Sequence, residues 1–219
     1  LTSISGNAEL LLNDTEANSR MRHAQTIVDA AGRMAGMINS LLEYFRLDSG
    51  KEMPSVKPFK LCSIAETLKT EFEPLAERKQ LSFMVENQAD EIASGDKDRI
   101  LSIGSNLLSN AIKFTSNGTI TLVTECKEST FVLTVEDTGT GMTEEQQQRI
   151  FIPFERLGNA VTEDGFGLGL AIVADTVKLL QGTVRVESKP GKGSRFTVCL
   201  PLPKAEETVR DEKTSMRHS

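Results

Sequence analysis

The sequence predicts an α+β protein in which a helical hairpin is followed by an α/β sandwich. Three observations lead to this fold class. Apolar residues in the first 47 positions recur at helical steps of three, four or seven. Later segments alternate between strand-like runs of period two and helical runs, which favours helices gathered on one face of a largely antiparallel sheet. Between the two parts, "LDSGKEMPSVKPF" contains two prolines and several turn residues, and it indicates a linker.

These boundaries divide the chain into four segments. We expect the hairpin over 1–47, the linker over 48–58, the α/β domain over 59–203 and a charged tail or linker over 204–219. The last segment offers almost no apolar residues for a core, so we predict no packed structure there.

The hairpin is predicted from two apolar runs separated by the turn cluster "NDTEANS". Two antiparallel helices are too thin to bury both apolar stripes, so we expect a second copy to complete a four-helix bundle. The alternative is that the hairpin packs against its own downstream domain. The apolar positions are Leu1, Ile4, Leu11, Ile27, Met34, Ile38, Leu41 and Phe45.

The α/β domain is expected to open with a short strand near 56–61 and a helix that has Ser63 as its N-cap. A strand around "LSFMVE" and a helix from Asp96 to about Phe114 follow. The rest of the domain is predicted as a strand hairpin, "TITLVTECK" and "FVLTVEDT", a short helix "TEEQQQRIF" capped by Thr143, a longer helix "LGLAIVADTVKLL", and two closing strands, "TVRVES" and "SRFTVCLPL".

Composition limits the possible functions. The 219 residues carry a formal charge of −6 with a pI near 5.1, which argues against the broad basic face of a nucleic-acid-binding protein. The odd, widely spaced cysteines Cys62, Cys126 and Cys199 fit reduced thiols in a cytosolic chain. No apolar run approaches the roughly 18 residues of a membrane span, and no signal peptide is expected.

The helix that starts at Asp96 carries a polar face. Asn106, Asn110 and Lys113 stand at i, i+4 and i+7, so two amides and an ammonium line up beside an apolar stripe. Mg²⁺ accepts amide oxygens and keeps phosphates among its ligands, and lysine reaches phosphates as a point charge. The face could therefore hold a metal triphosphate. The alternative is an ordinary solvated helix face.

The stretch "EDTGTGM" ends a predicted strand. Asp137 is a fixed acceptor that could take the exocyclic amino group of adenine, while Gly139 and Gly141 allow a close turn around the base. The alternative is a plain turn leaving the strand.

The stretch "DGFGLGL" places three glycines just before a helix. Glycine permits a close backbone approach, and the start of the helix offers unpaired N–H groups to an anion. The spacing is not that of a dinucleotide fingerprint, and a plain tight turn is the alternative.

Taken in order, these motifs resemble the catalytic core of sensor histidine protein kinases. "NLLSNAIKFT" resembles the N box, "DTGTGM" the first glycine box, "FIPFER" the F box, "GFGLGLAI" the second glycine box and "GKGSRFTV" the last one. The opening "LTSISG" resembles the segment that follows the phosphoacceptor histidine. The resemblance implies a dimerisation and phosphotransfer hairpin followed by a Bergerat-type ATP-binding domain, and it extends from Leu1 to Pro203.

The resemblance also implies ligands and residue roles. Asn110 would ligate Mg²⁺, and Asn106 and Lys113 would reach the phosphates of ATP. Asp137 would bind adenine, and Arg156 would approach the γ-phosphate that is transferred to a histidine. "GNAVTED" would be a mobile ATP lid. Further nucleotide-binding residues would be Gly139, Gly141, Gly165, Gly167, Leu168, Gly169, Leu170 and Thr197.

As partners, the resemblance implies a response regulator receiver domain and a second copy of the hairpin. It implies a cytoplasmic location, as part of an inner-membrane sensor, without direct membrane contact of this segment.

The sequence departs from the family pattern in two respects. Ser102 and Gly104 stand where such kinases often carry glutamine and an apolar residue, and a glycine inside a helix costs about 1 kcal/mol relative to alanine. The acceptor histidine and its neighbouring acid are expected about six residues before Leu1. His23 is not in an H-box pattern, so we assign it a surface or bundle-packing role.

Two rival functions are considered. Gyrase-type and mismatch-repair ATPases share the fold but resemble one another in a water-activating glutamate one turn before the metal-binding asparagine, where this chain has Asn106. Phosphotransfer is therefore favoured over hydrolysis. The second rival is a dimeric nucleotide-binding scaffold or relay module without catalytic activity.

Overall fold

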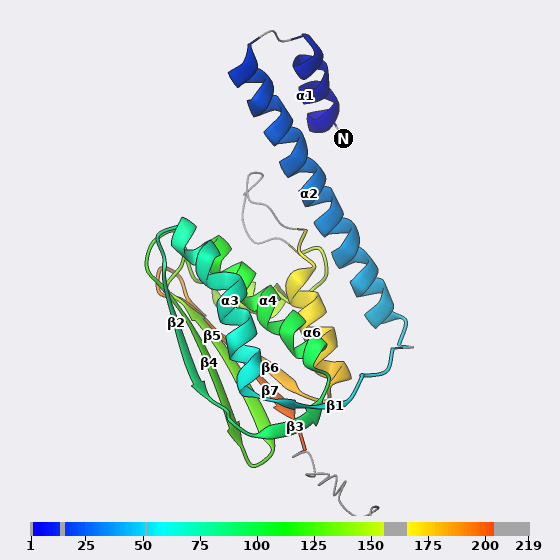
Figure 1. Cartoon of the computed structure of the whole chain (residues 1–219). Coiled ribbons are helices and arrows are strands. Elements are labelled where there is room, and N and C mark those ends of the chain that lie inside the picture. The colour runs from blue at the N-terminus through cyan, green and yellow to red at the C-terminus, as the bar shows by residue number, and fades with distance from the viewer. Residues whose placement is uncertain (1, 14–15, 51, 156–165, 204–219) are drawn as a thin grey trace, which may run out of the picture.

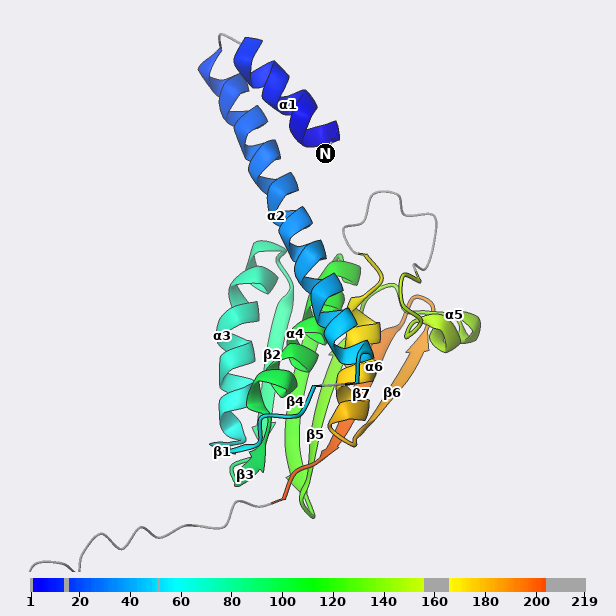
Figure 2. The ribbon, with the colours of Figure 1, turned by 90° about the vertical axis from the view of Figure 1, so that its right-hand side faces the viewer.

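The computed structural model describes residues 2–13, 16–50, 52–155 and 166–203. A long helical hairpin projects from one side of an α/β sandwich (Figure 1). The sandwich consists of a sheet with helices on one face (Figure 2). The predicted fold class is confirmed.

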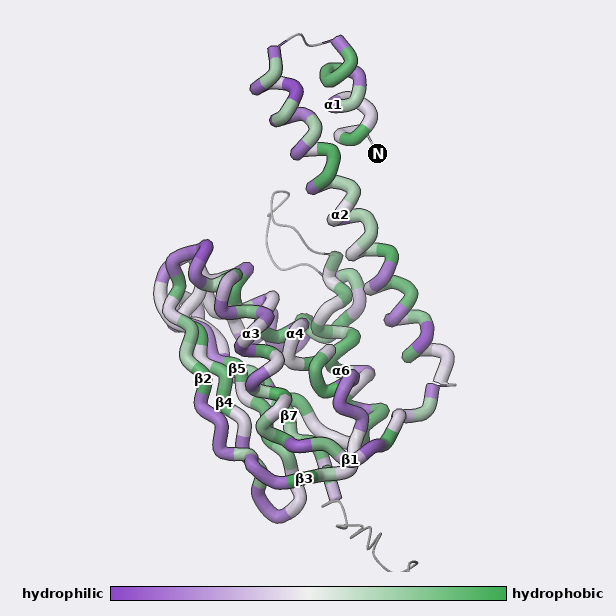
Figure 3. Tube along the Cα trace, viewed as in Figure 1, coloured by the Kyte–Doolittle hydropathy of each residue, from purple (hydrophilic) through white to green (hydrophobic). Residues whose placement is uncertain are grey.

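The hairpin consists of α1 (Thr2–Asn13) and α2 (Ala17–Asp48). Across the two helices, His23 Nδ1 lies 3.0 Å from Asn7 Oδ1, so the histidine helps to pack the hairpin. Among the described hairpin residues only Ala30 is buried. Apolar residues recur along both helices (Figure 3). Large apolar side chains that remain exposed are Leu10, Leu12, Met21, Val28, Met37, Ile38, Leu42 and Phe45.

A small sheet and a helix follow the linker. Strand β1 (Lys57–Lys60) pairs antiparallel with β3 (Ile92–Gly95), a strand that the sequence analysis missed. Helix α3 runs over Cys62–Arg78. The prediction of Ser63 as its N-cap was wrong: the cap is Leu61, and the Ser63 hydroxyl donates to Lys60 O at 2.6 Å instead of accepting from the helix.

The main sheet has the strand order β2-β4-β5-β7-β6. Its strands are β2 (Ser82–Gln88), β4 (Thr119–Lys127), β5 (Thr130–Asp137), β6 (Thr183–Lys189) and β7 (Gly193–Pro201). β2 and β4 are parallel, and the other neighbours are antiparallel. Burial alternates along β4, β5 and β7, because one face of the sheet meets the helices and the other meets solvent.

Helices α3, α4 (Lys97–Phe114) and α6 (Gly169–Leu179) cover the inner face of the sheet, and the short α5 (Glu144–Arg149) lies beside β6 (Figure 2). The predicted cap Thr143 of α5 is confirmed, and the N-cap of α4 is Asp96, the residue at which the helix was expected to start. Gly104 has a packing reason, because a Cβ there would lie 2.4 Å from Leu68 Cδ1 of α3. The core between helices and sheet includes Leu68, Ile100, Ile103, Leu107, Phe131, Leu133, Val173 and Val198.

The second half of α2 lies along α6 and near α4. The rings of Tyr44 and Phe154 meet edge-on, with centroids 6.2 Å apart, and Ser102 Oγ lies 3.0 Å from Glu43 Oε1. Packing of the hairpin on its own downstream domain, the alternative raised from the sequence, therefore applies to this half of α2. The tip of the hairpin projects away from the sandwich (Figure 1).

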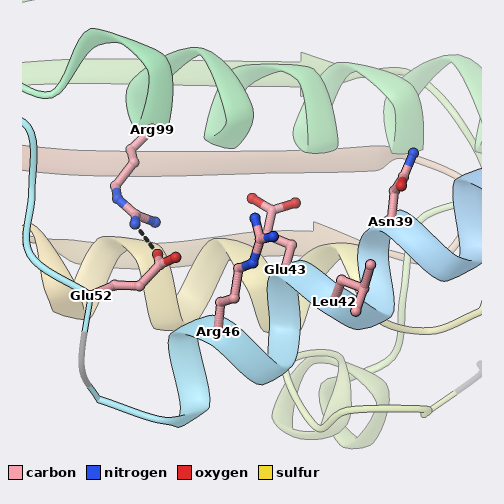
Figure 4. Close-up of a pocket in the computed structure, with 6 residues that line it drawn as sticks. All are labelled: Asn39, Leu42, Glu43, Arg46, Glu52 and Arg99. Atoms are coloured by element: carbon pink, nitrogen blue, oxygen red, sulfur yellow. Dashed lines mark hydrogen bonds and ion pairs between the residues drawn. The ribbon is translucent and has the colours of Figure 1, made fainter.

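A pocket of about 400 Å³ opens between the end of α2, the linker and α4 (Figure 4). Within it Arg99 of α4 pairs with Glu52 of the linker, and it also lies 3.4 Å from Asp96. The pocket is polar and lies beside the contact of α2 with the α/β domain. Its lining residues are Asn39, Leu42, Glu43, Arg46, Glu52 and Arg99.

Over the parts of the chain that the structure describes, we find no helix with both the length and the apolar character of a membrane span.

Candidate functional site

The polar face of α4 is formed as the spacing predicts. The helix starts cleanly because Asp96 Oδ1 accepts the Arg99 N–H at 3.1 Å. Asn106, Asn110 and Lys113 are all half-buried along it. Asn106 Nδ2 donates to Ser102 O at 2.9 Å. This bond uses only the amide nitrogen, so the amide oxygen of Asn106 can accept from or bind another group. Lys113 Nζ lies 4.6 Å from the centre of the Phe114 ring.

Asp137 ends strand β5 on the inner face of the sheet and is 7% exposed. One carboxylate oxygen accepts the Gly139 N–H at 2.8 Å, and the Ser194 N–H also donates to the carboxylate. Burial raises the pKa of Asp137 above its ordinary value of 3.8, although these two N–H donors act in the opposite direction. The result is a buried, oriented acceptor at the end of the sheet.

Three glycines near Asp137 stand where a side chain has no room. A Cβ on Gly139 would lie 2.4 Å from Phe114 O, at the end of α4. Gly141 and Gly193 both have positive φ, and a Cβ on them would lie 1.9 Å from Lys189 O and 1.8 Å from Asp137 O, respectively. The first and last glycine motifs therefore contact each other and the end of α4 by backbone atoms.

The second glycine motif also lies next to α4, at Asn106 and Asn110. Gly167 has φ +70°, and its carbonyl accepts the Phe154 N–H at 2.9 Å. α6 begins at Gly169 without a side-chain cap. A Cβ on Gly169 would lie 2.8 Å from Asn106 Oδ1 and 4.0 Å from Asn110 Nδ2. The uncapped start of α6 therefore lies against the two amides of α4.

The flanking leucines of this motif point into the protein. Leu168 is buried, and Leu170 is partly buried against the core. They hold the start of α6 in place by packing, and neither offers a polar side chain to a ligand.

The F box is anchored by α5. Arg149 Nη2 lies 2.7 Å from Glu155 Oε1, and Phe154 adopts a positive φ of 64°. The predicted site residues Arg156 and Gly165, and with them the predicted lid, lie outside the described residues.

The prediction for Thr197 needs correction. Thr197 pairs with Thr134 of β5, and both side chains lie on the outer face of the sheet, away from Asp137. Ser194 is the residue directly opposite Asp137. The period of two in "SRFTV" contains this signal, because Ser194 shares the parity of the buried Phe196 and Val198, whereas Thr197 does not.

Sequence reasoning also missed Ser188. Its hydroxyl accepts the Met142 N–H at 2.8 Å, donates to Gly193 O at 2.8 Å and lies 3.0 Å from Ser194 Oγ. These bonds join the first glycine motif to the last one. None of the sequence motifs indicated Ser188, because its hydrogen-bond partners lie in two other segments of the chain.

Comparisons with known proteins agree with this arrangement. The family model described as histidine kinase-, DNA gyrase B-, and HSP90-like ATPase matches residues 95–204, and that of the His Kinase A (phospho-acceptor) domain matches residues 1–50. The autoinducer 2 sensor kinase/phosphatase LuxQ of Vibrio parahaemolyticus is 31% identical over 228 residues, covering 99% of this chain and 26% of LuxQ. The sensor histidine kinase RcsC of Salmonella typhimurium is 31% identical over 214 residues, covering 96% of this chain and 23% of RcsC.

Among solved structures, full-length ShkA in complex with AMPPNP is similar with a TM-score of 0.77 and 26% identity, covering 93% of this chain and 43% of that one. The chain spans about a quarter of the length of the curated relatives it matches.

The fold and the motifs around α4 thus define a nucleotide-binding domain joined to a phosphoacceptor-type hairpin. The chain belongs to the histidine kinase-, DNA gyrase B-, and HSP90-like ATPase family and, within it, to the sensor histidine kinases.

Proposed function

We propose that this chain binds ATP with Mg²⁺ and transfers the γ-phosphoryl group to a histidine, for relay to an aspartate of a response regulator receiver domain. The observation that carries the proposal is that the first and second glycine motifs both lie against the second half of α4, the helix that carries Asn106, Asn110 and Lys113. The start of α6 lies against Asn106 and Asn110, while Gly139 lies against both Phe114 O and Asp137. The proposed adenine acceptor at the end of β5 and the proposed phosphate-binding start of α6 therefore both lie next to α4.

In this proposal Asn110 ligates Mg²⁺ through its amide oxygen, and Asn106, Lys113 and the N–H groups at Gly169 hold phosphates. Among the described residues there is no cluster of three or more His, Cys, Asp or Glu side chains. An amide oxygen suits a hard ion such as Mg²⁺, which takes phosphate oxygens among its other ligands. Asp137 accepts the amino group of adenine, and Arg156 neutralises charge on the γ-phosphoryl group.

Phosphotransfer is supported over hydrolysis by the chemistry of Asn106. A hydrolytic member of the fold needs a carboxylate at this point to activate water. The Asn106 amide cannot accept a proton, and its nitrogen already donates to Ser102 O. Water activation from this position is therefore not supported.

The hairpin serves, in our proposal, for dimerisation and phosphotransfer, with the acceptor histidine upstream of Leu1. His23 is held by Asn7 inside the hairpin, which suits a packing role better than that of an acceptor. The exposed apolar side chains on both helices support a homodimer. We keep the division into hairpin 1–47, linker 48–58, ATP-binding domain 59–203 and tail 204–219 as part of this proposal.

Labelling from γ-labelled ATP tests the proposal. The chain extended upstream through the predicted histidine should acquire acid-labile, base-stable label, because that protein would hold both the acceptor and the site. Asn110→Ala in the extended protein should abolish labelling and the magnesium-dependent part of ATP binding. Ser109→Ala, on the exposed side of the same helix, is the matched control and should label normally.

Absence of label in the extended protein, with ATP binding retained, would favour the scaffold function. Label on His23 would contradict the position of the acceptor. Calorimetry showing unchanged magnesium-dependent affinity in Asn110→Ala would remove Asn110 from the metal site.

A further inference from the structure

Three side chains stand next to one another in one row of the sheet. Asp137 of β5 pairs with Ser194 of β7, and Ser194 pairs with Ser188 of β6. Directly paired residues on neighbouring strands project from the same face, so all three lie on the inner face of the sheet. Asp137 is buried, and the two serines are half-buried. The row lies beside the first glycine motif, to which Ser188 is hydrogen-bonded through the Met142 N–H.

The hydrogen bonds of Ser188 fix the direction of each proton in this row. A serine hydroxyl has one proton to donate and two lone pairs that accept. The carbonyl of Gly193 can only accept, so the bond of 2.8 Å to it uses the single proton of Ser188. The Met142 N–H occupies one lone pair at 2.8 Å. The contact of 3.0 Å with Ser194 Oγ must therefore be donated by Ser194.

The position of Ser188 itself is held by Gln147 of α5. Gln147 Nε2 lies 3.0 Å from Ser188 O and 3.3 Å from Met142 O, so it ties β6 to the end of the first glycine motif. Ser188 thus sits at a rigid junction of three segments.

These bonds determine which hydrogen-bonding groups Ser194 and Asp137 present to a ligand. Because the proton of Ser194 is used by Ser188, Ser194 Oγ presents only lone pairs. The Asp137 carboxylate next to it also only accepts when ionised. This end of the sheet is therefore a pair of acceptors, which complements an amino group and opposes a carbonyl.

We propose that Ser188 is a specificity-determining positioning residue, which keeps Ser194 as an acceptor beside Asp137 so that the site selects a purine with a 6-amino group over one with a 6-carbonyl. This inference rests on the proposed adenine site. A carbonyl placed against these two acceptors meets no donor there, so the lone pairs that face it stay unpaired, and unpaired buried polar groups are the basis of strong discrimination. Without the Ser188 hydroxyl, Ser194 can rotate and donate to a carbonyl.

The test compares ATP with inosine triphosphate, in which a carbonyl replaces the 6-amino group. Each nucleotide displaces a fluorescent ATP analogue from the whole chain, and the ratio of the two dissociation constants measures selection at position 6. In Ser188→Ala the preference for ATP should fall about 3- to 10-fold, the equivalent of one hydrogen bond. Equal weakening of both nucleotides would show a merely structural role and would overturn the proposal.

Two control variants accompany this measurement. Ser188→Thr keeps the hydroxyl and should keep the preference of the parent protein. Thr134→Val removes a hydroxyl from the outer face of β5, so it should leave the preference unchanged. If circular dichroism shows that Ser188→Ala is unfolded, Ser194→Ala takes its place: it removes the second acceptor and should lower the preference to a similar extent. An unchanged ratio in Ser194→Ala overturns the proposal equally.

Asp137→Asn separates this inference from the proposed function. If Asp137→Asn reduces the preference for ATP while Ser188→Ala does not, the adenine site stands and only the role of Ser188 is wrong. If neither variant changes the ratio, the base is not recognised by this row, and the proposed adenine site fails with the inference.

Discussion

The α/β domain and the hairpin differ in how far they bury their apolar side chains. The α/β domain buries its apolar side chains between one sheet face and three helices, and residues such as Phe131, Leu133 and Val198 have no exposed surface. The hairpin has helices as long as α2 (Ala17–Asp48) but buries only Ala30 among its described residues. The domain covers its apolar side chains within one copy, whereas the hairpin leaves apolar side chains exposed, as the proposed homodimer requires.

This difference in burial indicates which part suits nucleotide binding and which part suits association with other helices. A rigid, well-packed domain can hold backbone groups and side chains in fixed positions, as the site around α4 requires. The hairpin leaves apolar side chains exposed, which the proposed second copy would cover, while the second half of α2 also lies along α6 of its own chain.

The largest expected effect is a loss of stability when a buried side chain of the α/β domain is truncated. Phe131→Ala should lower the free energy of unfolding by about 3 to 5 kcal/mol, because it opens a cavity in a fully buried site. Phe45→Ala in the hairpin is the matched truncation at a side chain that is 55% exposed, and in dilute protein it should cost less than about 1 kcal/mol. Urea denaturation measures both, and equal losses would erase the contrast between the two regions.

A second test addresses the incomplete core of the hairpin. Val28→Asp should weaken self-association about 10- to 100-fold, because it places an unpaired carboxylate in the expected bundle interface. Val56→Asp in the linker is the control, since Val28 and Val56 are 63% and 62% exposed. Sedimentation equilibrium gives the dissociation constants. Self-association unaffected by Val28→Asp would place the dimer contact elsewhere.

The third prediction concerns Asp137, whose buried carboxyl should lower the stability of the nucleotide-free protein as pH rises. Burial raises the pKa of Asp137, so the folded state binds its proton more tightly than the unfolded state. As pH rises from 3.8 through the raised folded-state pKa, the unfolded state loses this proton first, and the stability of the nucleotide-free protein falls. At pH values below this range, Asp137 is protonated in both the folded and the unfolded state, so it does not contribute to the dependence of stability on pH.

Asp137→Asn should remove that fall in stability, and it should weaken ATP binding by about 1 to 3 kcal/mol through loss of a charged acceptor. Denaturation curves measured across the pH range, with and without ATP, check both effects. Parallel pH profiles in the parent and the variant would contradict the assignment of the shift to Asp137.

The smallest effect concerns the contact between the two regions. Ser102→Ala removes the hydrogen bond to Glu43 and should cost about 0.5 to 1 kcal/mol. Ser109→Ala on the exposed side of α4 corrects for helix propensity. In a double-mutant cycle with Glu43→Gln, additive losses would mean that the contact contributes nothing in solution.

The sequence by itself determined the features that depend on local spacing. Asn106, Asn110 and Lys113 share one face because they belong to one helix with a period of 3.6 residues. The cap Thr143 was predicted for a similar reason, since a cap acts within one turn of its helix. The order of the glycine motifs was also sufficient to indicate the family.

Only the tertiary structure decided which distant segments meet. The parallel pairing of β2 with β4, the strand β3 and the register that puts Ser194 rather than Thr197 opposite Asp137 depend on contacts far apart in the chain. So do the approach of Gly169 to Asn106 and the junction at Ser188. Local periodicity fixes the direction of a side chain within its own element, but the choice of a partner element is made by the packing of the whole core.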